Sequence, residues 1–79
     1  MTGEELKVAR ASLGNQWGFG RPLHRSELGR ACGLGPLDPG QMIRRYEEGK
    51  ASVPMPMSIL VRLYLKGIMP PDGLEGIRR

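Results

Sequence analysis

The fold is decided by one short stretch, DPGQMIRRYEEGK, which covers residues 38–50. This stretch is predicted to form a sharply bounded helix. Asp38 is a typical N-cap residue, and Gln41 three positions later would complete a pair that resembles a capping box. Pro39 suits the first helical position, where no amide hydrogen is needed. Gly49 follows the last turn, where a residue in the left-handed region commonly ends a helix.

The two sides of this helix carry different chemistry. Three residues supply a narrow apolar edge for packing, namely Met42, Ile43 and Tyr46. Three polar residues stand on the rest of the surface, namely Gln41, Arg44 and Arg45. Glutamine and arginine side chains make bidentate contacts to purine edges in a DNA major groove. The stretch is therefore interpreted as a DNA recognition helix.

A charge-rich helix face can also be no more than a solvated surface. In that alternative, Arg44 and Arg45 simply pair with Glu27, Glu47 or Glu48. Glu47 is expected to be structural in either case and to bond an arginine or a helix cap. A carboxylate that faced phosphates would be repelled.

Further helices are expected before and after this stretch. The first is predicted over residues 4–13, starting from a capping box of Thr2 and Glu5 and stopping at Gly14. A second is predicted over residues 23–33, and its central Gly29 makes sense if another helix crosses very close to it. The last is predicted from Pro56 to Gly67, after a segment that prolines keep from being helical.

The loop over residues 15–22 holds most of the aromatic mass of the chain in Trp17 and Phe19. These rings are expected to fold back and fill the small core, although an exposed contact loop is the alternative. The only cysteine, Cys32, is interpreted as a small buried hydrophobe because no base partner for a nucleophile is apparent.

Composition limits the classes of function. The chain has 79 residues, a net charge of +4 and a pI of about 9.8, which is compatible with nucleic acid without demanding it. One cysteine and one histidine provide neither an internal disulfide nor a zinc ligand set. No catalytic cluster or phosphate-binding glycine loop is recognisable, so no enzyme activity, cofactor or small-molecule ligand is expected. The absence of a signal peptide or a long apolar run predicts a cytoplasmic chain without a membrane partner.

The chain resembles the Cro/C1-type helix-turn-helix family, also called the XRE family. Residues 23–34 match the family pattern of leucine, cap, helix, Glu-Leu-small-Arg and closing glycine, and residues 42–50 are similar to its recognition helix with a terminal Glu-x-Gly-Lys. The resemblance implies an all-α fold, a small four-helix helix-turn-helix domain of the lambda-repressor type over residues 1–67. Residues 68–79 are then expected to form a loosely ordered tail. The loop before the second helix and the turn over residues 35–38 are longer than in the family.

The resemblance also implies a function. The expected activity is sequence-specific binding of double-stranded DNA by a transcriptional regulator, a dimeric repressor or autorepressor of a bacterial, phage or integrative-element operon. Base contacts are expected from Gln41, Arg44 and Arg45, and contacts to the DNA backbone from Arg21, Arg25, Ser26, Gly40 and Lys50.

A homodimer on an inverted-repeat operator is expected to form through Met57, Ile59 and Leu63. These three residues could equally cover the core of their own chain. The alternative function is an antitoxin or antiactivator that uses the same fold to bind a protein partner.

Overall fold

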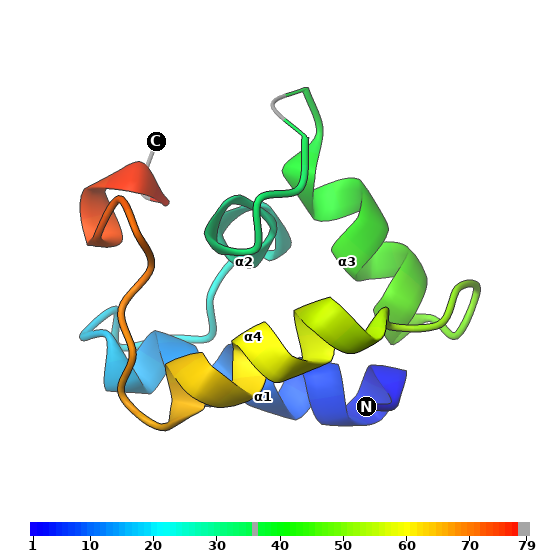
Figure 1. Ribbon diagram of the computed structural model, residues 1–79, viewed down its shortest axis with the longest axis horizontal. Coiled ribbons are helices and arrows are strands. Elements are labelled where there is room, and N and C mark those ends of the chain that lie inside the picture. The colour runs from blue at the N-terminus through cyan, green and yellow to red at the C-terminus, as the bar shows by residue number, and fades with distance from the viewer. Residues whose placement is uncertain (36, 78–79) are drawn as a thin grey trace.

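The computed structural model describes residues 1–35 and 37–77, and within these residues the chain is all-helical. The elements in order are α1 (Gly3–Gln16), α2 (Arg25–Ala31), α3 (Pro39–Glu47), α4 (Met55–Leu65) and a short 3-10 helix, η1 (Leu74–Gly76). Helices α1 and α4 lie side by side, and the pair α2 and α3 sits across them (Figure 1). The predicted all-α fold with four helices and a central helix-turn-helix pair is confirmed.

Helix α1 starts as predicted but ends later. The Thr2 hydroxyl accepts from the Glu5 amide at 3.1 Å, and the Glu5 carboxylate accepts from the Thr2 amide at 2.9 Å. The predicted stop at Gly14 is wrong, because Gln16 is the last residue of the helix. Gly18, two residues beyond it, has a φ of +81° and turns the chain away from the helix axis. A Cβ at Gly14 would lie 1.8 Å from the backbone oxygen of Arg21. That glycine therefore serves a close approach of the following loop and not the end of the helix.

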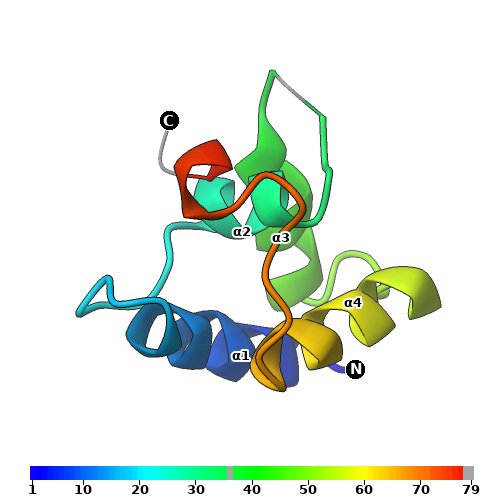
Figure 2. The same ribbon diagram turned by 60° about the vertical axis from the view of Figure 1, so that its left-hand side comes forward.

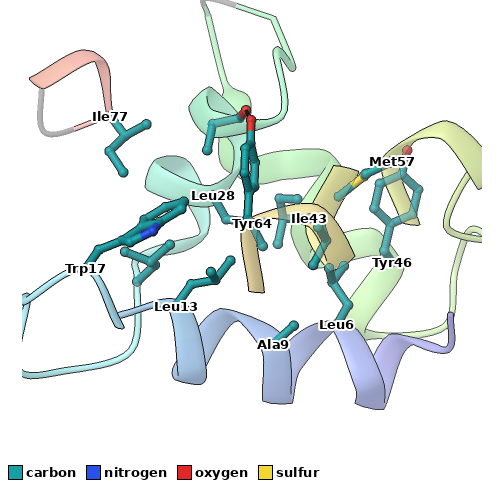
Figure 3. Packing of buried hydrophobic residues seen from close by; sticks show 13 residues of the cluster. Leu6, Ala9, Leu13, Trp17, Leu28, Ile43, Tyr46, Met57, Tyr64 and Ile77 are labelled. Atoms are coloured by element: carbon teal, nitrogen blue, oxygen red, sulfur yellow. Dashed lines mark hydrogen bonds between the residues drawn. The ribbon is translucent and has the colours of Figure 1, made fainter. Parts of the chain in front are cut away.

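The core draws on every α-helix, as Figure 3 shows. Among the described residues, thirteen hydrophobic side chains are buried: Leu6, Ala9, Leu13, Trp17, Leu23, Leu28, Ala31, Ile43, Tyr46, Met57, Val61, Tyr64 and Ile77. Trp17 packs edge-on against Tyr64 with ring centroids 5.5 Å apart, and Phe19 is half-buried against the same cluster. The prediction that these two aromatic rings fold back onto the core is confirmed.

The segment after α4 returns to α2, beside which it lies in Figure 2. Ile77 is only 2% exposed, and its carbonyl accepts two hydrogen bonds from the Arg30 guanidinium at 2.8 and 3.1 Å. The expectation of a loosely ordered tail is wrong as far as Ile77, while its last part, Arg78 and Arg79, lies outside the described residues. Among the residues that the structure describes, no helix combines the length and apolar character needed to cross a membrane.

Candidate nucleic-acid interface

Helices α2 and α3 cross with their backbones in near contact. A Cβ at Gly29 of α2 would lie 1.9 Å from the carbonyl oxygen of Pro39, which opens α3. A Cβ at Gly40 would lie 2.9 Å from the backbone nitrogen of Ser26. The predicted close crossing at Gly29 is confirmed. Gly40 was expected to let the backbone approach DNA, but its open side is turned to α2, so it packs the two helices together.

The ends of α3 are set by different means. Asp38 occupies the N-cap position, yet its side chain makes no capping hydrogen bond, so the predicted cap pair with Gln41 is wrong. The amide of Gln41 instead donates to the Asp38 carbonyl at 3.2 Å. At the other end, Gly49 has a φ of +76° and the Lys50 amide donates to the Arg45 carbonyl at 2.9 Å, which is the predicted glycine-terminated helix end.

The turn between α2 and α3 leads directly into the first turn of α3. Its predicted extent includes Pro36, which lies outside the described residues. Leu37 in this turn is 98% exposed, so its side chain is almost entirely open to solvent.

The two sides of α3 are separated as predicted. Ile43 and Tyr46 are buried in the core, and Met42 is half-buried beside them. Successive residues of a helix are turned by about 100° from one another. Three exposed side chains thereby share the side of α3 that faces away from the core: Gln41, Arg44 and Arg45. This set is the outward face of α3.

The residues of the outward face differ in how they are engaged. Arg44 Nε lies 3.3 Å from a carboxylate oxygen of Glu48, one turn further along the helix. Lys50 Nζ lies 3.4 Å from the other oxygen of the same carboxylate. Within residues 1–35 and 37–77, Arg45 has neither an ion pair nor a side-chain hydrogen bond, so its guanidinium is available to a ligand.

A buried carboxylate fixes the aim of α3. The Glu47 side chain is 3% exposed and accepts from Arg10 of α1 at 2.7 and 3.1 Å. Arg25 at the start of α2 donates to the same carboxylate through Nε at 3.2 Å. Arg10 also donates to the Leu23 carbonyl at 2.6 Å. The prediction that Glu47 is structural is confirmed, because it ties α1 and α2 to the C-terminal turn of α3.

A second carboxylate holds the loop before α2. Glu27, which is buried, accepts from both terminal nitrogens of Arg21 at 2.9 and 3.1 Å and from the His24 amide at 2.6 Å. Burial by itself would raise the pKa of Glu27, but these hydrogen bonds outweigh burial and hold that pKa below its ordinary value. The Arg21 guanidinium also lies 5.2 Å from the centre of the Phe19 ring. The Arg21 guanidinium is therefore held by contacts within its own chain.

The exposed apolar residues of α4 differ from those predicted for the dimer face. Met57 is 7% exposed and belongs to the core of its own chain, so its assignment to the dimer face is wrong. Ile59 and Leu63 are 50% and 42% exposed, and Met55 is 67% exposed. Met55, Ile59 and Leu63 follow one another at four-residue intervals, so they form one apolar stripe along α4. Sequence reasoning missed Met55 because helix α4 was expected to start one residue later, at Pro56. The four-residue spacing of Met55 from Ile59 is the signal that could have placed it on this stripe.

A groove of about 390 Å³ runs between α1 and α4. Its lining includes the apolar residues Met1, Val8, Ala9 and Leu65 and the charged residues Glu4, Glu5 and Arg62. Val8 is 58% exposed, so part of the apolar lining is open to solvent.

The side chain of Cys32 belongs to neither face. Burial raises the pKa of its thiol to about 12, so the thiol stays protonated at neutral pH and is a poor nucleophile.

Searches of protein-family models, of curated proteins and of solved structures found no match to this chain. Membership of the XRE family therefore remains a prediction that rests on the quoted residues. The interface can be argued only from its own geometry.

Proposed function

We propose that this protein is a sequence-specific regulator of transcription that binds double-stranded DNA with α3 in the major groove. The outward face of α3 carries the proposal. Gln41 and Arg45 can each form paired hydrogen bonds with a base edge, glutamine with adenine and arginine with guanine. An arginine without an ion pair has none to break before it binds, and Arg45 has no ion pair among the residues that the structure describes.

Contacts to phosphates are proposed on either side of α3. Arg25 is 41% exposed and gives only its Nε hydrogen to Glu47, which leaves the four other hydrogens of its guanidinium for a phosphate. Lys50 is 65% exposed and supplies a second cation just beyond α3. Arg21 is left out of the proposed contacts because Glu27 already binds it in a bidentate manner.

A second copy of this chain is the proposed partner in DNA binding. A monomer of this size reaches one groove, whereas a two-fold dimer reads two half-sites about 34–36 Å apart. The stripe of Met55, Ile59 and Leu63 is proposed as the centre of the contact. A standard interface takes about 800 Å² from each partner, and the chain exposes 4807 Å² in total, so about one sixth of its surface would suffice.

The proposed setting is the cytoplasm of a bacterium, where such a dimer would act as a repressor or autorepressor of a chromosomal, phage or integrative-element operon. Control by protein concentration would follow, because dimerisation depends on concentration.

Selection of bound sequences from random duplex DNA tests the proposal. We expect an inverted repeat whose half-sites are separated by one helical turn, or a multiple of it. If no shared motif emerges at moderate salt, the proposed function is wrong. The variant Arg45→Ala should then lose preference at one base pair per half-site. Lys50→Ala should weaken binding to all sequences alike and reduce the salt dependence of binding by about one unit of slope.

The α1–α4 groove favours a second candidate function, which is binding of a partner protein as an antitoxin or antiactivator. Its solvent-exposed apolar lining, which includes Val8, could bind an apolar side chain of such a partner. Salt separates the two candidates. A stoichiometric protein complex that is insensitive to salt would favour the partner protein, whereas steep salt dependence with sequence preference would favour DNA.

A further inference from the structure

A carboxylate lies on the surface that is proposed to meet a polyanion. Glu48 follows Gln41 by seven residues, and at about 100° per residue the two side chains point in nearly the same direction from α3. Glu48 is exposed, in contrast to its neighbour Glu47, which is buried under Arg10. The position of Glu48 is therefore not explained by packing in the core.

Glu48 bridges two cations of the same surface. Its two carboxylate oxygens lie 3.3 Å from Arg44 Nε and 3.4 Å from Lys50 Nζ. The hydrogen bond from Arg44 and the charge of Lys50 hold the pKa of Glu48 below its ordinary value, so the carboxylate is ionised at neutral pH. In the free protein, Arg44 and Lys50 thus share the single negative charge of Glu48, which offsets one of their two positive charges, whereas Arg45 has no ion pair among the described residues.

We propose that Glu48 is a specificity-determining residue, which weakens binding to arbitrary DNA and accepts a hydrogen bond from a base amino group in the target. This inference rests on the proposed function of α3. It goes beyond that function because it assigns discrimination to a residue that is neither a cation nor an amide.

The discrimination follows from what each kind of DNA offers. Binding to arbitrary sequence comes almost entirely from contacts between cations and phosphates. There Glu48 competes with phosphates for Arg44 and Lys50, and its own charge is repelled. In the major groove of a suitable sequence, the N4 amino group of cytosine or the N6 amino group of adenine can donate to a carboxylate. The cost of the negative charge is then offset only at the target.

The test compares Glu48→Gln with the wild-type protein on two duplexes, the selected target and a scrambled sequence of equal length. For the scrambled duplex, we expect Glu48→Gln to bind about three- to tenfold more tightly at low salt, with a salt slope steeper by about one unit. For the target, we expect no such gain. The ratio of target to scrambled affinity should therefore fall about three- to tenfold, because removal of the charge strengthens binding to the scrambled duplex alone.

Glu75→Gln is the matched control. It removes the same charge from an exposed position on η1, at the opposite end of the view from α3 in Figure 1. We expect it to strengthen binding to both duplexes by the same small factor. Because Glu48 is exposed, its replacement should shift the melting temperature by no more than about 4 °C.

The outcomes separate this inference from the function on which it rests. If wild-type protein prefers a target but Glu48→Gln strengthens both duplexes equally, or neither, then Glu48 does not determine specificity and only this inference fails. If the wild-type protein shows no sequence preference at all, the proposed function fails and this inference fails with it.

Discussion

Replacing Gly29 by alanine tests the crossing of α2 and α3, because two effects of opposite sign compete there. In an ordinary helix interior, alanine is more favourable than glycine by about 1 kcal/mol. At Gly29, however, the added Cβ would lie 1.9 Å from the carbonyl oxygen of Pro39 and 2.5 Å from its carbonyl carbon. Since both atoms belong to the backbone, no side-chain rotation can clear the overlap, and the two helices must separate by about an ångström.

Overpacking of this kind typically costs about 1–3 kcal/mol. We expect a cost at the upper end of that range, because a backbone must move, and hence a net loss of about 2 kcal/mol in the free energy of unfolding. For a domain of this length, whose total stability is about 4–12 kcal/mol, such a loss lowers the melting temperature by about 8–16 °C. Urea unfolding followed by circular dichroism measures it directly.

Gly35→Ala provides the control for the same chemical change. Apart from its chain neighbours, a Cβ at Gly35 would meet no atom of the described residues within 4 Å, so alanine there should leave stability unchanged or raise it by up to about 1 kcal/mol through the unfolded state. A Gly29→Ala protein that unfolds at the same urea concentration as wild type, or at a higher one, would show that the close crossing does not constrain the fold.

Three further predictions concern ion pairs and the exposed stripe of α4. Glu47→Gln should cost about 3 kcal/mol of stability, since it leaves Arg10 buried without its counter-ion; a loss below 1 kcal/mol, measured by urea unfolding, would contradict this. The pKa of Glu27 is lowered in the folded state, so its contribution to stability is present above the ordinary value of 4.5 and is lost as the pH falls below it. Between pH 7 and pH 3, the free energy of unfolding should therefore fall less in Glu27→Gln than in wild type. Equal decreases in the two proteins would refute the role of the ion pair between Glu27 and Arg21. For the proposed dimer, Ile59→Glu should raise the dissociation constant measured by sedimentation at least tenfold. An unchanged dissociation constant would show that the α4 stripe is not part of the interface.

The parts of the fold that local chemistry controls could be predicted from the sequence. The capping box of Thr2, the glycine end at Gly49 and the apolar side of α3 each depend on residues within one or two turns of one another. The close crossing at Gly29 was also predictable, because a glycine in the middle of a helix otherwise only lowers its stability.

Two of the errors arose where a distant segment decides the outcome, whereas the cap pair expected between Asp38 and Gln41 was a local prediction that also failed. Gly14 has the sequence appearance of a helix end, but its role is set by the backbone of Arg21 passing over α1. The return of Ile77 to Arg30 joins residues 47 positions apart, which no local pattern encodes. Met57 lies at the helical spacing of core residues, and the packed structure places it in the core and leaves Met55, Ile59 and Leu63 exposed on α4.

The candidate site followed the same division. The outward face of α3 was predictable because the helical period separates Gln41, Arg44 and Arg45 from the core. The partner of Arg25 was not, because Glu47 reaches it from 22 residues away. Nor was the bridge from Glu48 to Lys50, which depends on how the chain turns after Gly49.

The division of α3 into two sides also bears on how such a protein can change over evolution. Everything that anchors this helix, from Ile43 and Tyr46 to the carboxylate of Glu47, is directed toward the rest of the molecule. Among the described residues, the one ion pair made by the outward face joins Arg44 to Glu48, which directly follows α3. Substitutions at Gln41, Arg44 or Arg45 should therefore cost little stability, so that under the proposed function the recognised sequence could change through single surface mutations.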